Sequence, residues 1–151
     1  PDVKVVLPVH LNPQVRAAAH RILGGQERVH LIAPLAYGDF ANLMARCYLV
    51  LTDSGGLQEE APALGRPVLV LRETTERPEA VVAGTVKMVG TDGDRIFQAV
   101  ATLLQNVEEY SRMANAVNPY GDGKAAERIV QAIRYFFKLT TQPGEEYGSE
   151  L

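Results

Sequence analysis

The residues best suited to chemistry in this 151-residue sequence form one short run of small, hydroxyl and acidic side chains, residues 53–60, Asp-Ser-Gly-Gly-Leu-Gln-Glu-Glu. The run follows an apolar, strand-like stretch and opens a helical pattern. Gly55 and Gly56 let a ligand approach the backbone closely. The free amides and the dipole of a helix start favour an anion such as phosphate, and the Ser54 hydroxyl adds a donor. A plain tight turn with a helix cap would use the same residues, so the run alone fits both readings.

Two carboxylates, Glu59 and Glu60, follow within the first turns of the expected helix. A carboxylate suits the two hydroxyls of a ribose because it offers paired acceptors. Acidic residues at this position are also stabilised by the helix dipole without any ligand. If the carboxylates are functional, the geometry describes a nucleoside diphosphate lying across the helix start.

Two further loops come directly after strand-like runs. The loop 72–78 contains Arg77, which could hold a diphosphate bidentately, and two threonine hydroxyls. The loop 8–13 contains His10. A solvated charged loop and a structural histidine are the alternatives for these two features.

Composition excludes several classes of function. The net charge of −3 and the scattered Lys and Arg give no footprint for nucleic acid or for a membrane surface. No apolar run reaches the roughly 20 residues of a spanning helix. The single cysteine, Cys47, excludes an internal disulfide and fits a reducing compartment, so we expect a cytoplasmic protein. No spacing suggests a metal site, and no Gly-x-Gly-x-x-Gly is present, so we expect neither a metal nor a dinucleotide cofactor.

Short apolar runs alternate with helical periodicity along the chain, which predicts an α/β fold with a Rossmann-like, doubly wound parallel sheet. We expect strands at roughly 3–7, 28–32, 48–52, 67–71 and 85–89. Helices should begin at Pro13, capped by Asn12, and after a cap at Asp39. Because such sheets bind ligands at the carboxyl ends of their strands, the loops after the strands should carry the site.

The pattern after Gly90 is helical, with a turn cluster at residues 118–123 before the last helix. A first apolar stripe consists of Ile96, Val100, Leu103, Leu104 and Val107. A last helix should turn inward the residues Ala126, Ile129, Val130, Ile133, Phe136 and Phe137. Residues 142–151 form a polar tail that we expect to be frayed.

Several motifs in a fixed order make the chain resemble one family from about residue 3 to residue 138. They are Pro8-Val9-His10-Leu11-Asn12-Pro13, Pro34-Leu35-Ala36-Tyr37, Asp53-Ser54-Gly55-Gly56-Leu57-Gln58-Glu59-Glu60-Ala61-Pro62, Leu64-Gly65-Arg66-Pro67-Val68-Leu69, Thr74-Thr75-Glu76-Arg77-Pro78-Glu79, Ala83-Gly84-Thr85 and Asn118-Pro119-Tyr120-Gly121-Asp122-Gly123. Together they resemble the C-terminal half of the non-hydrolysing UDP-N-acetylglucosamine 2-epimerases.

The resemblance implies a GT-B-type fold of two Rossmann-like domains, and an enzyme that interconverts UDP-N-acetylglucosamine and UDP-N-acetylmannosamine without a metal or cofactor. The family eliminates UDP to give 2-acetamidoglucal and then adds it back. By position, Ser54, Gly55 and Gly56 would hold the phosphates, Glu60 the ribose, and Arg77 and His10 the departing diphosphate, so these last two would also be catalytic. Pro34, Tyr37 and Phe40 would border the uracil.

The resemblance also implies a domain division. Residues 1–141 would be the UDP-binding domain, and the N-terminal domain, which carries most of the family's acid and base carboxylates, would be absent from this chain. We therefore expect a piece of a longer enzyme of cell-surface polysaccharide biosynthesis, homodimeric as a whole and inactive as this piece. The alternatives are the donor-binding half of a GT-B glycosyltransferase and a non-enzymatic UDP-sugar-binding module.

Overall fold

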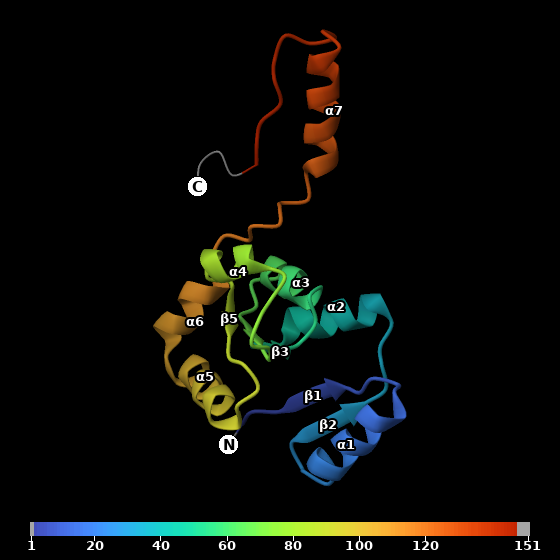
Figure 1. Cartoon of the computed structure of the whole chain (residues 1–151), viewed down its shortest axis with the longest axis vertical. Coiled ribbons are helices and arrows are strands. Elements are labelled where there is room, and N and C mark those ends of the chain that lie inside the picture. The colour runs from blue at the N-terminus through green and yellow to red at the C-terminus, as the bar shows by residue number, and fades with distance from the viewer. Residues whose placement is uncertain (1, 148–151) are drawn as a thin grey trace. The chain divides into compact units, whose positions relative to one another are not determined.

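The computed structural model describes residues 2–147, and the chain divides into two compact units, Pro1–Leu43 and Met44–Leu151 (Figure 1). Every strand ladder in the described chain is parallel. Helices connect the strands, so the expected α/β class with parallel sheets is confirmed. Hydrogen bonding places two strands in a sheet of the first unit and three strands in a sheet of the second.

The first unit consists of β1 (Val5–Pro8), α1 (Pro13–Leu23), β2 (Val29–Ile32) and the start of α2 (Tyr37–Arg46). β1 pairs in parallel with β2, and α1 contacts β2. The expected start of α1 is confirmed, because the Asn12 side chain accepts a hydrogen bond from the Gln14 amide at 2.9 Å. That bond satisfies one of the amides that a helix start leaves open.

The predicted cap of α2 at Asp39 is wrong. The Phe40 amide donates to the Ala36 carbonyl at 2.9 Å, so the helix already begins at Tyr37. Asp39 therefore lies in the first turn, where the helix dipole stabilises its charge without a capping bond.

The second unit holds most of the elements. They are β3 (Val50–Thr52), α3 (Leu57–Ala63), β4 (Val68–Val70), α4 (Pro78–Ala83), β5 (Val86–Met88), α5 (Gly93–Gln105), α6 (Val107–Ala114) and α7 (Ala125–Phe136). The strand order is β3-β4-β5. α3 contacts β3 and β4, whereas α5 packs on β4, and Figure 1 shows α5 and α6 on the opposite side of this sheet from α3.

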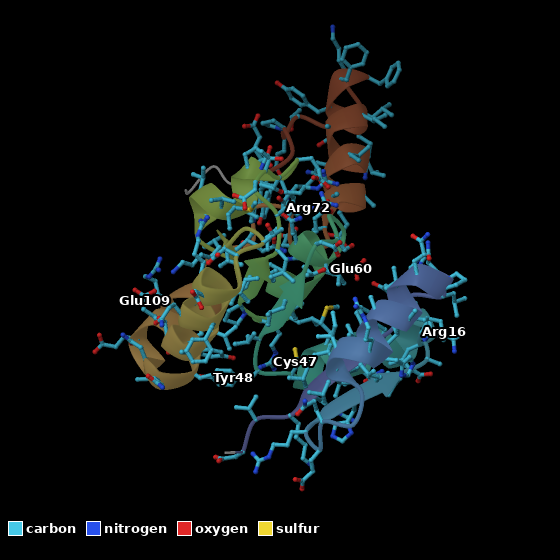
Figure 2. The ribbon with its side chains drawn as sticks, turned by 60° about the horizontal axis from the view of Figure 1, so that its bottom comes forward. Arg16, Cys47, Tyr48, Glu60, Arg72 and Glu109 are labelled. Carbon is cyan, nitrogen blue, oxygen red and sulfur yellow. The ribbon has the colours of Figure 1, made fainter. Side chains whose placement is uncertain are left out.

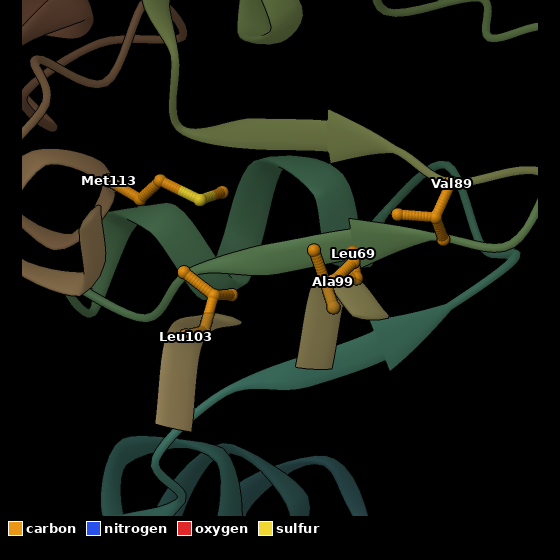
Figure 3. Close-up of a cluster of buried hydrophobic side chains, with 5 residues drawn as sticks. All are labelled: Leu69, Val89, Ala99, Leu103 and Met113. Carbon is orange, nitrogen blue, oxygen red and sulfur yellow. The ribbon is translucent and has the colours of Figure 1, made fainter. Parts of the chain in front are cut away.

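The core of the second unit lies on both faces of β4. Leu69 packs in a cluster with Val89, which directly follows β5, with Ala99 and Leu103 of α5, and with Met113 of α6 (Figure 3). Val68 and Val70 point to the opposite face because side chains alternate along a strand, and they are fully buried there. A central strand buried on both faces is what its continuous apolar run predicts.

The expected single helical stripe after Gly90 is interrupted. Asn106 ends α5 and caps α6, since its side-chain oxygen accepts hydrogen bonds from the amides of Glu108 and Glu109, both at 3.0 Å. Val107, which begins α6, is 71% exposed. Within α5, Leu103 is buried whereas Leu104, one residue on, is 39% exposed, so the predicted stripe holds for only part of α5.

The inward face predicted for the last helix is also wrong for the described chain. No residue of α7 is buried, and its aliphatic and aromatic side chains from Ile129 to Phe137 are mostly exposed. Periodicity shows that one face of the helix is apolar. It does not show that the surface which covers this face belongs to the described residues. Part of the expected polar tail makes contacts: Tyr147 donates to the Asn118 carbonyl, and the Arg128 guanidinium lies over the Tyr147 ring.

Within residues 2–147, the helices are too short or too polar for any of them to cross a lipid bilayer.

The division of α5 into a buried and an exposed side generates a prediction. Leu103→Ala should lower the free energy of unfolding by about 2–5 kcal/mol, the usual cost of a cavity at a fully buried leucine. Leu104→Ala, one residue on, should cost less than half as much because that side chain is already partly in water. Urea unfolding of both variants measures the difference. Equal losses would contradict the packing described for α5.

Candidate functional site

Two loops of the second unit meet at one edge of its sheet. β3 and β4 run in parallel with Thr52 opposite Val70, so the loops that follow them leave the sheet on the same side. Their side chains touch: Arg77 forms an ion pair with Glu59, and Thr75 donates a hydrogen bond to Gln58. The expectation that loops 53–60 and 72–78 share the carboxyl edge is therefore confirmed.

The start of α3 leaves backbone amides open. Gly56 is the N-cap residue, and no side chain caps the helix. The Ser54 amide donates to the Thr52 hydroxyl at 3.0 Å, which fixes the turn. Among residues 2–147, no hydrogen-bond acceptor meets the amides of Gly55, Gly56 and Leu57. Unpaired amides at a helix start are suited to an anionic oxygen.

Gly56 faces free space flanked by two polar side chains. Its φ of −61° is one that any residue adopts, so the backbone does not require glycine here. A Cβ at Gly56 would have the Glu60 carboxylate at 3.9 Å and the Ser54 hydroxyl at 4.0 Å as its nearest neighbours, which is ordinary contact. Figure 2 shows the Glu60 side chain on α3. The geometry leaves room for a ligand between these two groups.

Arg77 is held by acidic and main-chain oxygens. Its Nε donates to the Glu59 carboxylate, and its Nη1 donates to the Glu76 carbonyl at 3.3 Å. The hydrogen bond to Glu59 is the main reason that the pKa of Arg77 is raised. Nε and Nη1 are therefore both occupied, so the bidentate contact with a diphosphate expected from sequence requires Arg77 to release Glu59 or the Glu76 carbonyl.

The two arginines of the loop after β4 are each paired with a carboxylate, one in the same loop and one on α3. Arg72, labelled in Figure 2, forms an ion pair with Glu76 at 2.9 Å, and Arg77 pairs with Glu59. Two cations and two carboxylates therefore hold each other at the surface. An anionic ligand must compete with these carboxylates, and partly exposed pairs of this kind are broken at little cost because water screens them.

Sequence reasoning missed two residues beside this group. One is Tyr120: burial raises the pKa of its phenol, and the charges of Glu79 and Glu59 raise that pKa further. Its motif, 118–123, was interpreted as a turn and as one of the motifs that carry the resemblance, and no site role was given to it. Gln58 is the other: it is fully buried and bonded to both loops. Its place in the first turn of the expected helix, shortly after Ser54, was the only available signal.

The remaining predicted site residues belong to the first unit. His10 is exposed, and its Nδ1 accepts a hydrogen bond from the Asn12 amide at 3.1 Å. In the neutral ring the proton is therefore on Nε2, which makes that nitrogen a donor. Pro34 is exposed, Tyr37 begins α2 with 71% of its surface in solvent, and Phe40 is half-buried.

No group of three His, Cys, Asp or Glu side chains in the described part of the chain has the arrangement of a metal site.

Comparison with known proteins gives one consistent result. The family described as UDP-N-acetylglucosamine 2-epimerase matches residues 1–134. A UDP-N-acetylglucosamine 2-epimerase of Bacillus subtilis (strain 168) is 57% identical over 136 residues, which are 90% of this chain and 36% of that protein.

Solved structures agree. A Staphylococcus aureus MnaA–UDP co-structure is 49% identical with a TM-score of 0.87, covering 97% of this chain and 40% of that one. The UDP-GlcNAc 2-epimerase of Neisseria meningitidis bound to UDP-GlcNAc is 51% identical with a TM-score of 0.79, covering 86% and 36%. The chain thus spans well under half of the length of each relative.

The ion pair between Arg77 and Glu59 generates a prediction about the unliganded protein. Glu59→Gln should speed the hydrogen exchange of the Arg77 Nε–H, because a neutral amide is a weaker acceptor than a carboxylate. The free energy of unfolding should change little, since the pair is partly exposed. NMR of the arginine side chains and urea unfolding measure the two quantities. A persistent, protected Nε–H would show that another group holds Arg77.

Proposed function

Because the chain belongs to the UDP-N-acetylglucosamine 2-epimerase family, we propose that it is the UDP-binding, C-terminal part of an enzyme that interconverts UDP-N-acetylglucosamine and UDP-N-acetylmannosamine. The observation that carries this is the set of unpaired amides at the start of α3, flanked by Ser54 and Glu60. The relatives crystallised with UDP and with UDP-GlcNAc support the choice of ligand.

The nucleotide would lie across the start of α3. The amides of Gly55 and Gly56 and the Ser54 hydroxyl donate to the diphosphate, whose charge the helix start favours. Glu60, one turn into α3, accepts from the ribose hydroxyls with its two oxygens. Gly56 has no side chain, so the diphosphate reaches the backbone between Ser54 and Glu60.

Arg77 acts on the leaving group. In the proposed reaction the C2 proton is removed, the bond from C1 to the UDP oxygen breaks, and a C1=C2 double bond forms. UDP then adds back after C2 has been reprotonated on its other face. Negative charge develops on the diphosphate as it departs, and the terminal nitrogens of Arg77 stabilise it more than they stabilise the bound sugar nucleotide. The resemblance places most of the carboxylates that transfer the C2 proton in the N-terminal domain, outside this chain.

The residues of the first unit keep the roles that the resemblance implies. His10 would donate from Nε2 to the departing UDP, consistent with the bond that its Nδ1 accepts from Asn12. Pro34, Tyr37 and Phe40 would border the uracil. The homodimer and the cytoplasmic location also stay predictions.

The first test concerns the glycine at the helix start. Gly56→Ala should fold normally and gain up to about 1 kcal/mol, because alanine restricts the unfolded chain at a φ that it tolerates. UDP binding should weaken at least about tenfold, since the new methyl occupies the ligand's space. Isothermal calorimetry with UDP measures this.

Gly93→Ala is the matched control, because Gly93 also begins a helix and a Cβ there meets no other atom within 4 Å. Its UDP affinity should equal that of the wild type. A Gly56→Ala chain that binds UDP normally, or a wild-type chain with no binding at millimolar UDP, would contradict the proposed site.

The second test concerns activity. This chain, incubated with UDP-N-acetylglucosamine, should give no UDP-N-acetylmannosamine, because the groups that move the C2 proton are assigned elsewhere in the family. Anomeric-proton NMR of the reaction follows the conversion. Measurable epimerisation would place the acid and base within these residues. Transfer of the sugar to an added acceptor would instead favour the glycosyltransferase alternative.

A further inference from the structure

Gln58 is the largest polar side chain with no exposed surface in the described chain. A buried amide is costly unless its donor and acceptor both find partners. Both do: Nε2 donates to the Ser54 carbonyl at 3.3 Å, and Oε1 accepts from the Thr75 hydroxyl at 2.6 Å. One partner lies in the turn after β3 and the other in the loop after β4.

The hydrogen bonds continue to Arg77. The Arg77 amide donates to the Thr75 hydroxyl oxygen at 3.0 Å. Because the Thr75 hydrogen is used on Gln58, its oxygen is left to accept, and the direction of every bond is fixed. The series runs from the Arg77 amide through Thr75 to Gln58, and from the other end of Gln58 to the Ser54 carbonyl.

Two adjacent residues of α3 therefore hold Arg77, one through its side chain and the other through its main chain. Glu59 binds its guanidinium, and Gln58, through Thr75, binds its main-chain amide. The Glu59 pair is partly exposed, so a ligand can displace it. The Gln58 side chain itself has no exposed surface, so we expect its bonds to persist while the guanidinium changes partner.

From this geometry we propose that Gln58 is a positioning residue, which sets the distance between the phosphate-facing turn at Ser54 and Arg77. It does not touch the nucleotide, because it is buried beneath the loops. The proposal rests on the proposed UDP site. Only an amide of this length has a donor for Ser54 and an acceptor for Thr75; a glutamate would turn an acceptor toward the Ser54 carbonyl.

A first experiment tests the hydrogen bonds without any ligand. In the full chain, Gln58→Met and Thr75→Val should each speed hydrogen exchange of the Arg77 amide at least about tenfold, because one step of the series is lost. Thr75→Ser keeps the hydroxyl and should restore the slow rate. Met113→Ala, a core variant distant in sequence, should lower stability without this local effect. An Arg77 amide that exchanges equally slowly in Gln58→Met and the wild type would overturn the proposal.

A second experiment measures UDP affinity by calorimetry. Gln58→Met and Thr75→Val should each weaken UDP binding about tenfold, the equivalent of one lost hydrogen bond of ~1.4 kcal/mol. The double variant should be no weaker than either single one, because both break the same series. Met113→Ala should bind as the wild type does.

The outcomes separate the two proposals. Faster Arg77 exchange with unchanged UDP affinity, or fully additive losses, would overturn the positioning role while leaving the UDP site intact. A wild-type chain that does not bind UDP would overturn the proposed function and the positioning role with it. Loss of affinity in Met113→Ala equal to that in Gln58→Met would assign the effect to stability alone.

Discussion

The parallel pairing of β3 with β4 is the constraint on which the rest of the candidate site depends. Parallel neighbours end at the same edge, so their loops must leave the sheet side by side. The register, with Thr52 opposite Val70, brings residues 53–60 against residues 72–78 although nearly twenty residues separate them in sequence. The pairing is kept in place because β4 is buried on both faces, by α3 on one side and by the Leu69 cluster on the other.

Two kinds of interaction hold the loops at this edge of the sheet: exposed ion pairs and the hydrogen bonds of a buried amide. Exposed ion pairs keep the guanidinium groups of Arg72 and Arg77 near the edge, but they are worth little and exchange partners readily. The side-chain amide of Gln58 is buried, so water cannot take the place of its two hydrogen-bond partners unless the loops move apart. A site that must bind and release a charged leaving group needs both: a fixed backbone and cations that are free to change partner.

The sequence predicted those parts of the molecule that local rules control. Asn12 before Pro13 predicted the start of α1, and the apolar run around Leu69 predicted a central strand, because capping and burial leave a local signature. The division between α5 and α6 was missed although asparagine favours helix caps over helix interiors, because the apolar spacing from Ile96 to Val107 continues across Asn106. The sequence correctly predicted that α7 has an apolar face, but the prediction that this face is buried was wrong, because periodicity does not show which surface a helix face contacts.

The glycines show why the site was harder to predict than the fold. Gly84 has a φ of 79°, so its backbone conformation alone accounts for the residue that ends α4. Gly56 has an ordinary helical φ and no crowding at its Cβ, and neither conformation nor packing accounts for it. In the sequence the two residues look alike. Coordinates separate a glycine that the backbone requires from one that it does not. Gly93 also has open space at its Cβ, so the space alone indicates nothing, and what distinguishes Gly56 is its place between Ser54 and Glu60 beside unpaired amides.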